Sequence, residues 1–333
     1  MAVSKETKKV NNKIPNNRVP EEELAPNIQS VTLGNLTWSN IEQPSEKETK
    51  YLADHYPFHP LDLDDCLSRI QRPKIDEYDD YIFLVLHFPL FNPETRVTTS
   101  SQVSVFIGDN YLITLHKGEL KPLVKLFKEC EIDEETREEH LSHGSGYLLY
   151  RILDRLVDYC LPILSKIGDN LEMVEENIFS EEMPRAIRQI SILRRDVISF
   201  RRIIWPMRSV IGSLEPKVRR FTNIDLEVYY GDMIDHINKI WDGLDEYKEI
   251  IEGLHSTHDS LNSNRVNDIL RVLTILATIG TVLTVVASFY GMNVPLPGGS
   301  NPGGDNYSWL VLLGVMVGMM GLMLFYFHRK RWL

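Results

Sequence analysis

The hydrophobic pattern of the chain is dominated by two long uncharged runs near its C-terminus. The first covers the nineteen residues from Val272 to Tyr290, and the second extends from Trp309 to Phe327. An α-helix rises about 1.5 Å per residue, so each run is long enough to cross most of the ~30 Å hydrocarbon core of a bilayer. The pattern predicts two transmembrane helices, residues 271–291 and 309–328, joined by a Pro/Gly-rich loop at 292–308.

The first predicted span is not uniformly apolar. Small and polar residues recur along it at alternating intervals of three and four, which places them in one stripe on a helix. The stripe consists of Asn267, Leu270, Thr274, Ala277, Thr281, Thr284 and Ser288. Polar groups are costly against lipid, so the stripe should face either a packed neighbouring helix or water. The residues alone support these two interpretations equally.

Upstream of this span, apolar residues keep a four-three spacing for five heptads, and no proline occurs between Pro216 and Pro295. This seam consists of Leu226, Tyr230, Met233, Ile237, Ile240, Leu244, Tyr247, Ile251, Leu254, His258 and Leu261. The pattern predicts one helix from about Asp225 to Tyr290, on the order of 95 Å long. Residues 216–270 are assigned to the cytoplasmic stalk that leads into the first span. We expect the seam to hold neighbouring copies of the helix in register.

The chain before the stalk predicts an α+β domain. The segments with the composition of strands are Val31–Ile41, Tyr81–Phe88, Gln102–Ile107 and Tyr111–His116, the last two flanking a Gly-Asp-Asn turn typical of a hairpin. After Leu120 the pattern is almost wholly helical. We expect residues 1–27 to form a mobile arm and residues 28–215 to form a domain of α/β/α layers.

The charges beside the two spans predict their orientation. Arg265 and Arg271 precede the first span, a basic tail at 329–333 follows the second, and Asp305 is the sole charge in the loop between them. Positive charges stay on the cytoplasmic side, so both termini are predicted to be cytoplasmic and the loop external. The chain is therefore expected to be a multi-pass protein of the plasma (inner) membrane, with the lipid bilayer as a partner.

Composition removes several other classes of function. The net charge is −11, and no basic groove interleaved with aromatic residues indicates nucleic acid. The three cysteines lack metal or disulfide spacing, and His55, His59 and His116 lack ligand spacing. No nucleophile lies beside a base, so we expect neither an enzyme nor an organic cofactor.

Gly291, Met292 and Asn293 close the first of the two predicted spans, and there the chain resembles the CorA-type magnesium channels. The resemblance extends to HPLDLDDCL, QRPKIDEYDDYIFLVL, IIWPMR and the basic tail ending in Trp-Leu. It implies a homopentameric funnel of cytoplasmic α/β domains joined to a stalk helix that lines a pore. Two spans per chain cannot enclose a pore, which agrees with an assembly of several copies.

The resemblance also assigns residues to the ion pathway. It implies a selectivity filter at Gly291, Met292 and Asn293, whose neutral oxygens suit a hydrated Mg²⁺ ion. The predicted pore lining is Asn267, Leu270, Leu273, Thr274, Ala277, Thr281, Thr284 and Ser288. Some members carry Met where this chain has Thr281, so a hydrophobic gate would rest on Leu270, Leu273 and Ala277. The external loop also lacks the Glu found shortly after the tripeptide in many members.

Four aspartates are implied as a regulatory site. The resemblance implies that Asp65 meets Asp232 of a neighbouring subunit around regulatory Mg²⁺, with Asp64 and Asp154 nearby. Opposed carboxylates repel each other unless a cation bridges them. Bound Mg²⁺ would hold the subunits together with the pore closed, and its loss would open the pore.

The expected function is a divalent cation channel for Mg²⁺, and for Co²⁺ or Ni²⁺, with passive influx driven by the membrane potential. No phosphate-binding loop or inverted repeat indicates a pump. Two alternatives stay open. One is a Zn²⁺, Ni²⁺ or Co²⁺ carrier of the same superfamily, which could be coupled to protons. The other is a membrane-anchored metal sensor or scaffold that conducts no ions.

Overall fold

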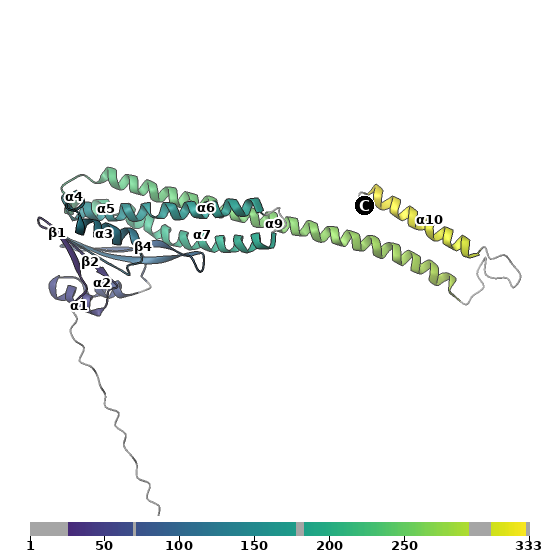
Figure 1. Cartoon of the computed structure of the whole chain (residues 1–333), viewed down its shortest axis with the longest axis horizontal. Helices are drawn as coiled ribbons and strands as arrows, with labels where there is room; N and C mark the ends of the chain where they lie inside the picture. Colours follow the sequence, from purple (N-terminus) through teal and green to yellow (C-terminus); the bar gives the residue numbers. More distant parts are fainter. Residues whose placement is uncertain (1–25, 69–70, 178–182, 293–307, 331–333) are drawn as a thin grey trace, which may run out of the picture. The chain divides into compact units, whose positions relative to one another are not determined.

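The computed structural model describes residues 26–68, 71–177, 183–292 and 308–330. The chain divides into two compact units (Figure 1). The first comprises Met1–Glu172 and Ser191–Lys248, and the second comprises Met173–Ile190 and Glu249–Leu333. Most of the predicted N-terminal arm and of the 292–308 loop lies outside the described residues.

A six-stranded sheet forms the centre of the first unit, in the order β1-β2-β6-β5-β4-β3. Only β2 and β6 pair in parallel, and every other neighbouring pair is antiparallel. The strands are β1 (Gln29–Leu33), β2 (Leu36–Glu42), β3 (Lys74–Glu77), β4 (Ile82–Asn92), β5 (Val97–Ile107) and β6 (Tyr111–His116). The hairpin predicted on either side of the Gly-Asp-Asn turn is confirmed as β5 and β6.

The prediction of one strand over Val31–Ile41 is wrong. The segment folds back on itself as the hairpin β1–β2, in which Leu33 pairs with Leu36. Gly34 lies at the turn with φ of +56°, a conformation that glycine adopts without the steric cost of a side chain. The alternating pattern continues through the turn, and this hides the reversal of chain direction.

Helices cover both faces of the sheet (Figure 1). Helices α1 (Glu46–His55) and α2 (Pro60–Leu67) cover one face, where Phe83 and Val85 of β4 belong to the same buried cluster as Leu52 and Leu63. The capping box of Ser45 and Glu48 fixes the start of α1.

Helix α3 (Lys121–Ile132) lies on the opposite face. The rings of Trp38 and Phe127 meet edge to face there, 5.0 Å apart, and both side chains are fully buried. The predicted α/β/α layering is therefore confirmed. Because β4 is covered on both faces, its sequence is a nearly continuous apolar run.

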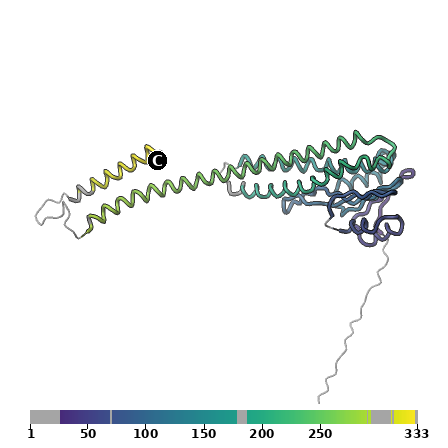
Figure 2. The backbone as a smooth tube through the Cα atoms, turned by 180° about the vertical axis from the view of Figure 1, so that it is seen from behind, coloured from purple at the N-terminus to yellow at the C-terminus, as the bar shows by residue number. Residues whose placement is uncertain are grey.

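The remaining helices of the chain are mostly long. They are α4 (Glu134–Leu141), α5 (Ser145–Asp158), α6 (Cys160–Asn177), α7 (Met183–Gly212), α8 (Glu215–Val218), the 3₁₀ turn η1 (Arg219–Phe221), α9 (Glu227–Tyr290) and α10 (Ser308–Arg329). In the first unit, α6, α7 and the start of α9 lie side by side (Figure 2). The Trp205 ring of α7 and the Trp241 ring of α9 are in contact, with centroids 5.1 Å apart.

The long helix predicted from about Asp225 to Tyr290 is confirmed as α9, which has 64 residues and contributes to both units. Part of the apolar seam of α9 packs against its own chain, whereas neighbouring copies of the helix were expected as its partner. From Leu226 to Leu244 the seam residues are buried within this single chain, and Tyr230 packs 6.0 Å from the ring of Tyr150 on α5. This part of the seam therefore attaches α9 to its own domain and is not available to neighbouring copies.

Two apolar residues of α3 provide a test of this packing. Leu126 is buried and Ile132 is 82% exposed. We expect Leu126→Ala to lower the free energy of unfolding by about 2–5 kcal/mol, because it leaves a cavity. Ile132→Ala should change it by less than about 0.5 kcal/mol. Urea unfolding followed by circular dichroism measures both, and equal losses would contradict the assigned layers.

Candidate functional site

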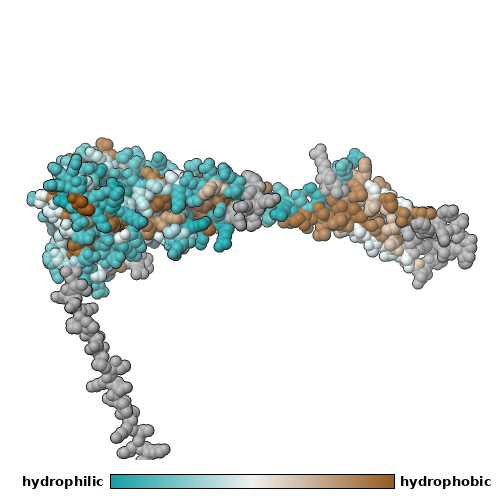
Figure 3. Space-filling view, in the orientation of Figure 1, coloured by the Kyte–Doolittle hydropathy of each residue, from teal (hydrophilic) through white to brown (hydrophobic). Residues whose placement is uncertain are grey.

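The second unit presents a large exposed apolar surface. Figure 3 shows it over the C-terminal half of α9 and over α10. Among the described residues, one helix is long and apolar enough to cross a membrane, Glu227–Phe289, and a shorter apolar stretch covers Leu313–Arg329. Exposed large side chains on this surface include Leu276, Val285, Phe289, Leu313, Leu322 and Phe325. Water does not favour such a surface, so lipid or partner helices must cover it.

Helices α9 and α10 lie side by side in this unit (Figures 1 and 2). Both carry a row of less exposed residues at four-three-four spacing, which is the pattern of two packed helices. These rows are Ile275, Ile279, Val282 and Val286 on α9, and Met316, Met320, Met323 and Phe327 on α10. Among the described residues, most of the remaining surface of α9 in this segment is exposed.

All eight residues predicted to line a pore are exposed. At about 100° per residue, they lie on the side of α9 roughly opposite to the row of Ile275 and Ile279. Thr274 Oγ1 donates to Leu270 O at 2.7 Å, and Thr284 Oγ1 donates to Gly280 O at 2.8 Å. Each hydroxyl proton is thus used within the helix, while the oxygen lone pairs stay available as acceptors.

The predicted filter lies where α9 ends. The Gly291 amide donates to Ala287 O at 3.0 Å, and Met292 follows with 54% of its surface exposed. A Cβ at position 291 would lie 3.3 Å from Ala287 O, so glycine suits this close approach. Asn293 lies outside the described residues.

Asp64 and Asp65 lie in α2, on the first face of the sheet. Asp64 is exposed. Asp65 is already paired, since its Oδ1 accepts from Gln71 Nε2 at 2.6 Å and its Oδ2 lies 2.7 Å from Lys74 Nζ. Burial opposes the charge on Lys74, but hydrogen bonds to Asp65 and Asp76 raise the pKa of its ammonium group above the ordinary value.

Asp154 and Asp232 belong to a second acidic group, formed by α5 and α9. His236 lies between the carboxylates, with Nδ1 3.1 Å from Asp158 Oδ1 and Nε2 3.9 Å from Asp232 Oδ2. Burial and the negative charge of Asp158 raise the pKa of Asp154. The charge of Asp232 raises this pKa further, whereas Arg151 and His236 lower it. The group therefore has unbalanced negative charge.

The single chain brings together only some of the four predicted regulatory residues. Asp154 and Asp232 share one electrostatic environment, whereas Asp64 and Asp65 lie on the other side of the sheet. Sequence reasoning missed Lys74 as the partner of Asp65, and it missed Asp158 and His236. The spacing of Asp154 and Asp158 by four residues on a helix was the available signal.

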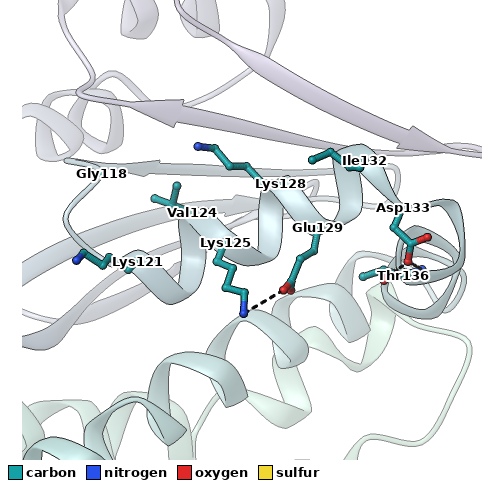
Figure 4. A pocket seen from close by; sticks show the side chains of 9 residues that line it. All are labelled: Gly118, Lys121, Val124, Lys125, Lys128, Glu129, Ile132, Asp133 and Thr136. Carbon is teal, nitrogen blue, oxygen red and sulfur yellow. Dashed lines mark hydrogen bonds and ion pairs between the residues drawn. The ribbon is translucent and has the colours of Figure 1, made fainter.

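Two hollows elsewhere in the first unit have linings that do not suit cations. One of about 560 Å³ lies over α3, where Lys121, Lys125 and Lys128 line it (Figure 4). Only Lys125 is drawn with an acidic partner, Glu129, at 3.5 Å. Another, of about 1230 Å³, is lined by Arg72, Arg201, Arg202, Arg208 and Lys248. Their positive charge would repel a metal ion.

The fold and the exposed surfaces define a membrane protein in which an α/β domain is joined to a long helix with a polar stripe. The model of the CorA-like Mg²⁺ transporter protein family matches residues 34–329, and the chain belongs to this family of divalent metal ion transporters.

Individual relatives extend over almost the whole chain. YfjQ of Bacillus subtilis, described as a candidate metal ion transporter, is 30% identical over 295 residues, which cover 89% of each chain. The cobalt/magnesium transport protein CorA of Thermotoga maritima is 29% identical over 306 residues, which cover 89% of this chain and 83% of that one. The solved structure of the CorA magnesium transporter of Methanocaldococcus jannaschii has the same fold, with a TM-score of 0.77 at 24% identity over 91% and 94% of the two chains.

The acidic group on α5 and α9 should make stability depend on pH and on divalent ions. Asp154 holds its proton more tightly in the folded chain, so its contribution to stability is present in acid and is lost as pH rises through its raised pKa. At neutral pH without divalent ions, Asp154→Asn should raise the unfolding midpoint by on the order of 2–4 °C. In acid the gain should disappear.

Mg²⁺ should raise the midpoint of the wild-type chain more than that of the Asp154→Asn variant. Calorimetry of the detergent-solubilised protein measures both effects. Asp242→Asn is a suitable control, since Asp242 is an exposed acid on the same helix. Equal responses of the two variants would contradict the proposed charge repulsion.

Proposed function

We propose that the chain forms a homopentameric channel that admits Mg²⁺, and also Co²⁺ or Ni²⁺, through the plasma membrane. In this proposal residues 271–291 and 309–328 span the bilayer, the loop at 292–308 is external, and both termini are cytoplasmic. Family membership supports the class of ion. The names of the Thermotoga maritima and Methanocaldococcus jannaschii relatives support Mg²⁺ and Co²⁺ within that class.

One observation carries the pore proposal: the exposed polar stripe of α9 lies roughly opposite to the less exposed row of Ile275, Ile279, Val282 and Val286 on the same helix. Uncovered hydroxyl and amide groups would be costly against lipid. Five copies around one axis would place the stripes around shared water. Thr274 and Thr284 would then offer oxygen lone pairs to the hydration shell of a passing cation.

The proposed filter consists of Gly291, Met292 and Asn293. Mg²⁺ gives up its water reluctantly, so a ring of neutral amide oxygens is suited to a hydrated ion. No residue in the proposed lining is charged, and ions would be held weakly enough to leave. A divalent ion that crosses a membrane potential of 100 mV gains roughly 4.6 kcal/mol of free energy, so influx requires no other energy source.

Regulation is proposed at the subunit interface. Asp65 of one subunit would face Asp232 of its neighbour across a Mg²⁺ ion, with Asp64 and Asp154 close to it. The pairing of Asp65 with Lys74 supports a switch, because the ammonium group and Mg²⁺ would compete for the same carboxylate. A partly exposed ion pair of this kind contributes about 0–1 kcal/mol, so a divalent ion can displace it.

Mg²⁺ entry into liposomes containing the purified protein, under an imposed potential, tests the channel and its regulation together. We expect flux that follows the potential and falls as Mg²⁺ rises on the side of the soluble domain. The Asp232→Asn variant should require a Mg²⁺ concentration at least about tenfold higher than the wild type to stop the flux, because the side chain at this position no longer carries a negative charge that binds Mg²⁺.

Asp242→Asn is the matched control, and its closure should equal that of the wild type. Flux that follows a proton gradient with Zn²⁺ but is absent with Mg²⁺ would favour the carrier. Absence of flux for every divalent ion would leave the sensor or scaffold. Unaltered closure in Asp232→Asn would refute the regulatory site alone.

Access to water tests the proposed pore face directly. A charged, membrane-impermeant thiol reagent should label Thr281→Cys at least about tenfold faster than Leu276→Cys at low Mg²⁺, because a thiol ionises and reacts only in water. The native thiols give little background, since Cys66, Cys130 and Cys160 are buried. Burial raises the pKa of Cys66 to about 12 and that of Cys130 to about 11. Equal labelling at the two positions would contradict the pore face.

A further inference from the structure

One turn of α9 carries a group of metal ligands that the proposed channel does not use. Within the described part of the chain, His255, His258 and Asp259 form a group of three whose ligand atoms all lie within 4.8 Å of one another. His255 Nε2 lies 3.9 Å from Asp259 Oδ2, and His258 Nδ1 lies 3.3 Å from Asp259 Oδ1.

The spacing makes this geometry a local property of the helix. Residues at positions i, i+3 and i+4 project from one face, so the sequence His-Ser-Thr-His-Asp brings all three side chains together wherever it is helical. The donors of a tetrahedral site lie roughly 3.3–3.4 Å apart, as follows from metal–ligand bonds of about 2.0–2.1 Å. The separations of 3.9 Å and 3.3 Å approach this value, and small side-chain rotations would complete the match.

The donors select a class of ion. Two imidazole nitrogens and one carboxylate suit Zn²⁺, Ni²⁺ or Co²⁺, whereas Mg²⁺ prefers six oxygen ligands and keeps several waters. His255 and Asp259 have 60% and 65% of their side chains exposed, so an ion and a water ligand can reach them. His258 is more covered, with 17% exposed, and its ring is accordingly more restrained.

We propose that His255, His258 and Asp259 bind one divalent transition-metal ion per chain, with water completing the coordination. The site lies eight residues before Asn267, about 12 Å along the same helix as the polar stripe. It differs in chemistry from the all-carboxylate Mg²⁺ site proposed at Asp65 and Asp232. The binding of the ion does not depend on whether the stripe lines a pore.

Zn²⁺ binding to the detergent-solubilised full chain tests the site, in millimolar Mg²⁺ to occupy oxygen-ligand sites. Competition with a chromophoric chelator gives the affinity and the number of ions bound. The His255→Gln, His258→Gln double variant should lose one Zn²⁺ per chain or bind it at least about a hundredfold more weakly, because losing even an outer-shell partner of a ligand typically costs about 10–100-fold in metal affinity. His55→Gln, which changes an exposed histidine on α1, should bind as the wild type does.

Spectroscopy distinguishes this site from others that hold Zn²⁺. X-ray absorption at the zinc edge should show two imidazole nitrogens in the wild type and none in the double variant. Both proteins should unfold at the same temperature without metal, since the two histidines are not in the buried core. Equal Zn²⁺ binding by wild type and double variant would overturn the proposal, as would displacement of the Zn²⁺ by millimolar Mg²⁺. Neither result would bear on Mg²⁺ flux.

Discussion

A stripe of polar side chains on a helix that crosses a membrane must be kept away from lipid, and the described residues of this chain leave the stripe of α9 exposed. Ile275 and Ile279 lie in the less exposed row of α9, whereas Asn267, Thr274 and Thr281 are exposed. Unsatisfied polar groups are costly in hydrocarbon. The cost of exposing these polar side chains to lipid is the argument for an assembly of several chains. It also connects the spacing of a few side chains with the proposed transport of ions.

The sequence predicts that faces of α9 are buried, but periodicity does not say what buries them. The seam from Leu226 to Leu244 was expected to join neighbouring copies, yet it packs within its own chain. A four-three repeat records only that one side of a helix avoids water. Whether the cover comes from the same chain depends on the path of α6 and α7, which local pattern does not encode. The turn at Gly34 was missed for a related reason, because alternation continues across it.

The candidate regulatory residues show the same limit. The resemblance singled out Asp65 as a site residue. It did not indicate that Lys74, which lies nine positions later on another element, would pair with the Asp65 carboxylate. The loop and strand geometry that brings the two side chains together is a tertiary property. The acidic group around Asp154 was partly visible in sequence, because Asp158 lies one helical turn away. Its connection to His236 needed the packing of α5 against α9.

Helix α9 carries three kinds of polar chemistry in order along its length, and their separation has a physical basis. Carboxylates near Asp232 suit a hard ion that keeps its water, and imidazoles at His255 and His258 suit a softer one. Neutral oxygens follow from Asn267 onward. Charged ligands would hold a divalent ion too tightly for it to move on, so binding sites and a conducting path cannot share the same residues. A single long helix satisfies both needs because 1.5 Å per residue keeps His258 and Asn267 more than 10 Å apart. In the proposed function, the ions that regulate the protein and the ions that cross the membrane would then be bound by different groups along one helix.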